Sequence, residues 1–151
     1  MARMIHPIAG ALALLTIVFF WFSTVSAELF GSGALLVTVK TMIPWGFLIL
    51  IPSLMAAGGS GLQLGKGWRN PLVSVKRKRM PIIAGNGLLV LIPSALYLSF
   101  KAQAASFDGW FYIVQTIELI AGAVNIALLS LNMRDGLRLT RKRPAVDDAS
   151  I

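Results

Sequence analysis

The chain contains no cysteine at any of its 151 positions. Without thiols it can form no disulfide, no thiolate metal site, no cysteine-ligated iron-sulfur cluster and no covalently attached c-type haem. Charged residues are also scarce, at 13% of the chain, whereas 56% of the residues are hydrophobic and the mean hydropathy is +0.76. A soluble domain has about 25% charged residues, so this composition indicates a protein whose solvent is lipid.

Apolar residues gather in four long stretches, which predict transmembrane helices at about 7–27, 35–57, 81–100 and 109–133. Each has about the 20 residues that a helix needs to cross the hydrocarbon layer. The expected fold class is all-α, a polytopic four-transmembrane-helix bundle forming one domain over 1–136, with a polar cytoplasmic tail over 137–151. Val25 and Ala27 would also suit signal-peptide cleavage before Glu28, but the long apolar core and the aromatic block at 19–22 favour an uncleaved helix.

Basic residues predict the orientation of the bundle. Of the 14 Lys and Arg residues, Arg3, six in the middle connection and five after Met133 make twelve. Because cytoplasmic loops retain Lys and Arg, the amino terminus, the middle connection and the carboxyl terminus are expected in the cytoplasm. The same charges predict attraction to anionic lipids at the cytoplasmic face, and nothing in their pattern points to nucleic acid.

The second and third stretches share a local repeat, GFLILIPS at 46–53 and GLLVLIPS at 87–94. Coincidence within a restricted alphabet is the simpler interpretation, whereas a true repeat would imply a pseudo-two-fold axis in the membrane plane. In either case Pro52 and Pro93 each remove a backbone donor and free the carbonyls of Leu48 and Leu89. A kink is therefore predicted in both helices.

Among the polar residues inside the apolar stretches, four are candidates for a function, namely Lys40, Gln115, Glu118 and Asn125. An ionised side chain at the centre of a membrane helix costs about 2.5 to 3.5 kcal/mol on insertion scales, so each needs a partner or a function. Desolvation favours a neutral carboxyl, and one interpretation therefore makes Glu118 a proton or cation carrier. The simpler interpretation pairs Glu118 with Lys40 as a clamp between helices and leaves Glu28 and Lys101 at the surface.

His6 is the only histidine, and it stands at the start of the first stretch. An imidazole for the iron, glycines that admit a flat macrocycle and a basic residue for the propionates would suit haem b. The residues of this hypothesis are His6, Gly10, Gly85, Asn86, Gly87 and Arg79. The second axial ligand would be His6 of another copy in a homodimer, or Met4 or Met80. A polar residue at the membrane interface is the simpler interpretation, and a quinone headgroup beside His6 is a further alternative.

No catalytic residues are indicated by the sequence. It offers no nucleophile with a base, no pair of catalytic acids and no cluster of metal ligands. The glycine-rich segments at 58–61 and 65–67 lack the spacing of a phosphate-binding loop. An enzymatic activity is therefore not expected.

Three segments carry a resemblance to known proteins: HPIAG at 6–10, KRMP at 78–81 and NMRDG at 132–136. In these segments and over most of its length the chain resembles a family of small bacterial inner-membrane proteins with four helices. The resemblance implies this topology and a place in the bacterial inner membrane, and it transfers no activity.

The sequence favours one function and leaves two alternatives open. The favoured function is a non-enzymatic subunit or accessory factor that packs against itself, as a homo-oligomer, or against a larger membrane complex through small-residue helix faces. The alternatives are a b-type haem or quinone electron-transfer protein using His6, and a small proton-coupled transporter using Glu118.

Overall fold

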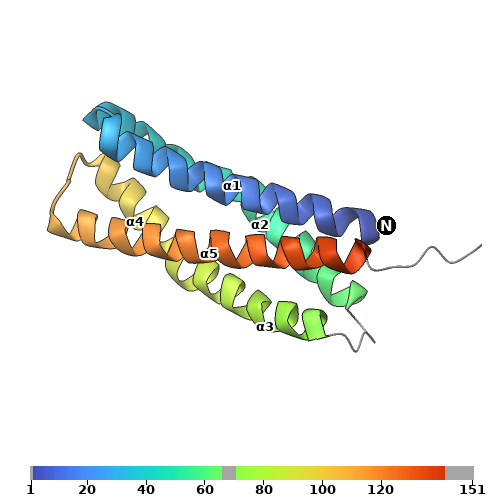
Figure 1. Cartoon of the computed structure of the whole chain (residues 1–151). Helices are drawn as coiled ribbons and strands as arrows, with labels where there is room; N and C mark the ends of the chain where they lie inside the picture. Colours follow the sequence, from blue (N-terminus) through green and yellow to red (C-terminus); the bar gives the residue numbers. More distant parts are fainter. Residues whose placement is uncertain (1, 66–70, 142–151) are drawn as a thin grey trace, which may run out of the picture.

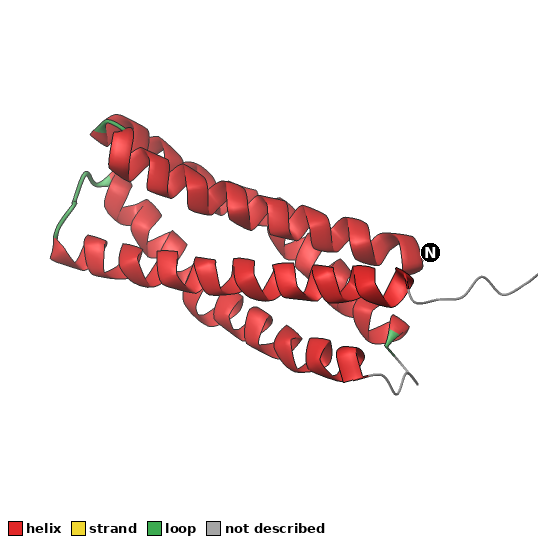
Figure 2. Cartoon of the chain, in the orientation of Figure 1, coloured by secondary structure: helices red, strands yellow, loops and turns green. Residues whose placement is uncertain are grey.

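The structure, a computed structural model, describes residues 2–65 and 71–141. Helices joined by short connections account for almost all of these residues (Figure 2). In chain order the elements are α1 (Ala2–Phe30), α2 (Gly33–Leu64), α3 (Pro71–Asn86), a π-helical turn (Gly87–Leu91), α4 (Ile92–Gln103) and α5 (Gly109–Arg141). The start of α1, the end of α2, the start of α3 and the end of α5 lie at the same end of the bundle (Figure 1). We call this end, which carries residues 76–79 and 134–138, the basic end, and the opposite end, with the connections at 31–32 and 104–108, the loop end.

Three helices extend well beyond their predicted bounds. The helix predicted to end at about 57 continues as α2 to Leu64. The third helical stretch begins at Pro71, so the predicted start at 81 was wrong: residues 76–79 are helical, and Pro81 lies inside α3. Lys and Arg are good helix formers, and Pro71 suits the first turn of a helix, where its missing N–H has no partner to lose. Likewise α5 continues to Arg141, so the polar segment predicted from 137 begins as helix, while 142–151 lie outside the described residues.

Capping residues fix the two connections at the loop end. Ser32 Oγ accepts a hydrogen bond of 3.3 Å from the backbone N–H three residues later and caps α2. A side chain at Gly31 would collide with the carbonyl oxygen of Ala27, which explains glycine at this turn. Asp108 Oδ1 accepts a hydrogen bond of 3.0 Å from the Phe111 N–H and caps α5.

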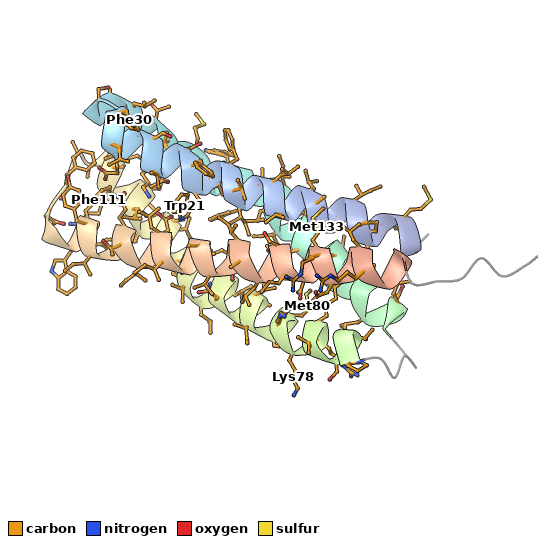
Figure 3. All side chains as sticks on the ribbon, in the orientation of Figure 1. Trp21, Phe30, Lys78, Met80, Phe111 and Met133 are labelled. Carbon is orange, nitrogen blue, oxygen red and sulfur yellow. The ribbon has the colours of Figure 1, made fainter. Side chains whose placement is uncertain are left out.

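Several polar side chains are buried inside the bundle, and many large apolar side chains project from its outer surface (Figure 3). The buried polar side chains are Thr24, Lys40, Ser53, Ser60, Ser99, Gln115, Asn125, Asn132 and Asp135. By contrast, Phe19, Leu48 and Leu89 are 69%, 72% and 75% exposed. A protein surrounded by water would bury such apolar side chains, so this distribution suits lipid. Four helices, Met4–Phe30, Gly33–Leu64, Val73–Gln103 and Gly109–Arg138, are long and apolar enough to cross a membrane.

Two apolar clusters lie inside the bundle beside its buried polar side chains. The cluster nearer the basic end consists of Ala13, Ile17, Leu50, Ile83 and Leu129. The cluster nearer the loop end consists of Ala27, Leu36, Leu98, Ala102 and Phe111. The most extensive helix contact joins α1 and α2, where the ring of Phe20 occupies the space that a side chain at Gly46 would need. Glycine at this position therefore allows the two backbones to approach closely.

The two proline-containing segments of the repeat adopt different backbones. Just before Pro93 the chain forms the π-helical turn, in which Gly87 O accepts a hydrogen bond from the N–H of Ile92. This wider turn is one of the ways a helix accommodates the carbonyl groups that proline leaves without donors. In contrast, α2 stays α-helical through Pro52. As a result α3 and α4 follow different directions, and α3 lies against α5 (Figure 1).

Candidate functional site

The inner face of α5 carries four of the nine buried polar side chains, more than any other helix. At intervals of three and seven residues this face presents Gln115, Glu118, Asn125, Asn132 and Asp135. Such spacing keeps the side chains on one side of the helix along its whole length. Helices α1, α2 and α3 add polar partners to this stripe, which forms three separate groups from the loop end to the basic end.

The first group lies toward the loop end and is named here the Lys40 cluster: Glu28, Lys40, Gln115 and Glu118. Lys40 Nζ lies 2.5 Å from Glu118 Oε2, and the two side chains are 1% and 11% exposed. This is the pairing that the clamp interpretation predicts, and it joins α2 to α5. Glu28 is partly exposed, and its carboxylate also accepts a hydrogen bond from Gln115 Nε2, a contact that the clamp interpretation did not include.

One acceptor in the Lys40 cluster has no donor. The side chain of Gln115 is 4% exposed, and its Oε1 has no hydrogen-bond partner among the described residues. Asn132 Oδ1 is the other such atom in the part of the chain that the structure describes. A buried acceptor without a donor costs about 1 to 3 kcal/mol, so a proton donor or a water would stabilise either position.

A small cavity adjoins Glu118 on the side of the basic end. Its volume is about 50 Å³, and its lining is mostly apolar, with Trp21, Phe47, Leu91 and Gly122 among its walls. Trp21 Nε1 donates a hydrogen bond of 2.9 Å to the carbonyl of Leu119, so the indole bridges α1 and α5 at this point. A cavity needs roughly 10 to 15 Å³ to hold a water, so this one admits water but no cofactor.

The second group is an asparagine pair at the middle of the bundle. Asn86 Nδ2 donates to the side chain of Asn125 at 2.9 Å and to the carbonyl of Ala121 at 2.8 Å. Asn125 Nδ2 donates in turn to the carbonyl of Ile83 at 3.3 Å. Gly87, at the start of the π-helical turn, lies beside the Asn125 amide. The pair therefore joins α3 to α5 where the α3–α4 segment changes direction.

The third group lies at the basic end and is named here the His6 cluster: His6, Ser60, Lys76, Arg79 and Asp135. His6 Nδ1 donates to the carbonyl of Ala57 at 2.9 Å, with Ser60 Oγ at 3.3 Å. The other ring nitrogen, Nε2, lies 3.1 Å from Lys76 Nζ and accepts its hydrogen, since an ammonium can only donate. Both nitrogens of His6 are therefore bound to groups of the chain itself.

An ion pair completes the His6 cluster on α5. Arg79 Nη1 lies 2.7 Å from Asp135 Oδ2, and the Asp135 side chain is only 3% exposed. Arg134 lies 3.4 Å from the other carboxylate oxygen. A side chain at Gly136 would come within 3.1 Å of Lys76 Nζ, so glycine at this position leaves space for the ammonium. The cluster thus connects α1, α2, α3 and α5.

The residues of the haem hypothesis lie in different parts of the structure. His6 and Arg79 belong to the His6 cluster, whereas Asn86 and Gly87 face Asn125. Lys76, which touches His6, precedes Asn86 on α3 by ten residues, or about 15 Å of helix rise. The sites of Gly10 and Gly85 are open, with nothing within 4 Å of where a Cβ would stand. Haem ligation by His6 stays a prediction, and it requires Lys76 to release the Nε2 atom.

Comparison with other proteins adds no assignment. The chain matches no known protein family, no curated protein and no solved structure. Within residues 2–65 and 71–141 there is also no group of three or more His, Asp or Glu residues placed to hold a metal ion.

Sequence reasoning missed several members of these groups. Asp135 follows Asn132 by three residues and continues the polar stripe of α5, so the spacing could have included it. Lys76 was counted only as an orienting charge. Ser60 gave no signal of its own, because its role depends on the position of His6 on another helix.

Proposed function

We propose that the chain is a multi-pass protein of the bacterial inner membrane, with both termini in the cytoplasm, that acts as a non-enzymatic subunit. The observation that carries this proposal is that the interior polar groups bind one another. Lys40 binds Glu118, Arg79 binds Asp135, and His6 binds Lys76. Side chains engaged in this way stabilise the helix bundle, and the cavity of about 50 Å³ is too small for an organic substrate.

The distribution of charge supports the orientation. The segments 76–79 and 134–138 stand together at the basic end (Figure 1), and Lys78 points away from the bundle (Figure 3). Basic residues that flank spanning helices stay in the cytoplasm during insertion. They also attract anionic lipids, at about 1 kcal/mol for each Lys or Arg near the surface. The basic end therefore faces the cytoplasm in this proposal.

The outer face of α5 offers the surface for a partner. There the exposed apolar side chains are interrupted by three small residues, Ala123, Ala127 and Ser130, spaced by four and three positions. Membrane helices associate where small residues allow close approach of the backbones, because lipid gives no hydrophobic driving force for association. We propose that this face packs against a second copy of the chain, as a homo-oligomer, or against a helix of a larger membrane complex.

Single-cysteine variants test this surface directly, since the natural chain has no cysteine to interfere. Ala127→Cys should give a disulfide-linked dimer in native membranes under mild oxidation. Ala84→Cys is the matched control, an exposed alanine on the outer face of α3, and it should stay monomeric. Ala127→Leu should weaken association after mild solubilisation, while Ala84→Leu should not. A monodisperse monomer that carries no co-purifying protein would contradict the proposal.

A further inference from the structure

The basic end carries more positive charge than its own carboxylate can balance. The segments 76–79 and 134–138 contain six Lys and Arg residues and one acidic residue, Asp135. Asp135 is already bound by Arg79 and Arg134. The other acidic residues that the structure describes lie toward the loop end. The basic end therefore offers positive charge to an anion from outside the chain.

Lys76 directs its ammonium into the bundle. Its Nζ lies 3.1 Å from His6 Nε2 and close to Gly136, whereas Lys78 points away from the bundle (Figure 3). Among the described residues no carboxylate lies within ion-pair distance of Lys76, and Asp135 acts on it only from further away. His6 holds the ammonium through one of its three N–H donors and brings no counter-charge. Lys76 is therefore a positioned cation with donors for a further acceptor.

In a bilayer the His6 cluster lies at the depth of the lipid headgroups. The four apolar helices have 27 to 32 residues each, more than the roughly 20 that cross the hydrocarbon layer. His6 is two residues from the start of the first of them, and Lys76 is three residues from the start of the third. Both side chains are half-buried, so a group in the headgroup layer can reach them. The phosphate of a phospholipid is an anion that this layer contains.

We propose that Lys76 and Arg79 bind the phosphate group of an anionic phospholipid. The two residues stand one turn apart on the same face of α3, and both are half-buried. Phosphate oxygens accept hydrogen bonds from the ammonium and from the guanidinium N–H groups that Asp135 leaves free. The acyl chains lie against exposed apolar side chains that follow the cluster toward the middle of the bundle, where Ile8 on α1 and Ile82 on α3 are 64% and 56% exposed.

A defined site differs from general attraction between a basic surface and anionic lipids. General attraction depends on the total charge, so removal of any one exposed Lys or Arg has a similar effect. A defined site depends on the cation that the cluster holds in place. Lys76 and Lys78 allow the comparison, because they lie two positions apart in α3 and only Lys76 contacts the cluster. Lys76→Gln and Lys78→Gln remove the same charge from the same helix.

Lipid titration of the purified full chain in a neutral detergent tests the site. Native mass spectrometry counts the lipids that stay bound. The natural chain should bind phosphatidylglycerol at least about tenfold more tightly than phosphatidylcholine, whose choline cancels the phosphate charge. Lys76→Gln should weaken phosphatidylglycerol binding by about tenfold or more, because a charge-assisted hydrogen bond is lost. Lys78→Gln should weaken it by no more than about threefold, since salt screens an exposed charge. Inorganic phosphate at the same concentration as the lipid should not displace it, because it lacks acyl chains.

Three results would overturn the inference. The first is equal affinity of the natural chain for the two lipids, a comparison that stands even if Lys76→Gln does not fold. The second is an equal loss of binding in Lys76→Gln and Lys78→Gln, with circular dichroism verifying both folds. The third is displacement by inorganic phosphate, which would assign the site to a soluble anion. The inference rests on the membrane setting of the proposed function and is independent of association through α5. A failure of Ala127→Cys to form a dimer would therefore leave lipid binding unchanged.

Discussion

Breaking the ion pair between Lys40 and Glu118 should destabilise the bundle strongly. Glu118→Gln conserves shape but removes the carboxylate that lies 2.5 Å from Lys40 Nζ. The ammonium would stay at a position that is 1% exposed and would lack its direct partner. Removing one member of a buried pair costs about 3 to 5 kcal/mol. Because Glu28 also attracts Lys40, the expected loss lies near the lower limit, at about 3 kcal/mol.

Reversible unfolding in mixed micelles can measure this loss. A loss of about 3 kcal/mol shifts the folding equilibrium by roughly two decades, since about 1.4 kcal/mol corresponds to a factor of ten. The double variant Lys40→Met with Glu118→Leu should recover most of the stability, because apolar side chains replace both charges and leave neither without a partner. If the free energy of unfolding of Glu118→Gln instead lies within about 0.5 kcal/mol of that of the natural chain, the pair contributes no more than a solvent-exposed one. The reasoning from burial would then be wrong.

Three further predictions concern other parts of the bundle. Gly46→Ala should lower the free energy of unfolding by about 1 to 3 kcal/mol, because its methyl group overlaps an aromatic ring of α1. Gly59→Ala, in the open part of the same helix, should raise the free energy of unfolding by about 0.5 to 1 kcal/mol. Equal effects of the two variants in unfolding assays would refute the close approach of α1 and α2. The hydrogen bond from Lys101 lowers the pKa of Asp108. The ionised Asp108 therefore stabilises the fold at pH values above the ordinary aspartate range, and this stabilisation is lost as the pH falls through the lowered native pKa. Thermal melts of Asp108→Asn should therefore show less acid sensitivity than the natural chain, and an unchanged acid profile would contradict this role. Lys78→Cys should react with a membrane-impermeant thiol reagent only from the cytoplasmic side, and labelling of intact cells would reverse the proposed orientation.

Hydropathy predicted the four apolar helices because their signal depends only on length and composition. It did not predict their ends at the basic end, where helices continue past the apolar stretches into polar residues. Beyond the apolar stretch, helix propensity decides the boundary, and the basic segment 76–79 consists of good helix formers. The prediction took the first residue of the apolar stretch, 81, as the first residue of the helix. The two boundaries depend on different physical properties.

Charge complementarity predicted the contact of Lys40 with Glu118, since both residues fell at a similar depth on different helices and neither had another ionic partner so deep. The contacts of Asn86 and Lys76 could not be found in that way. Their partners depend on the course of α3, which changes direction at the π-helical turn before Pro93. A proline predicts a perturbed helix, but the direction that the chain then takes is set by packing against the other helices.

The haem hypothesis shows the same limit in the functional site. It grouped His6 with Asn86 because hydropathy places both in the same half of the membrane, yet depth leaves the position around the bundle axis undetermined. In the structure His6 forms hydrogen bonds with α2 and Lys76, whereas Asn86 forms them with α5. Rotation of each helix is fixed by contacts such as the ring of Phe20 against Gly46, which no single-residue property encodes. In a bundle with a polar interior, an ion pair can be predicted from the positions of two opposite charges along the bundle axis. The partners of neutral polar groups depend in addition on the helix rotations, which apolar packing sets.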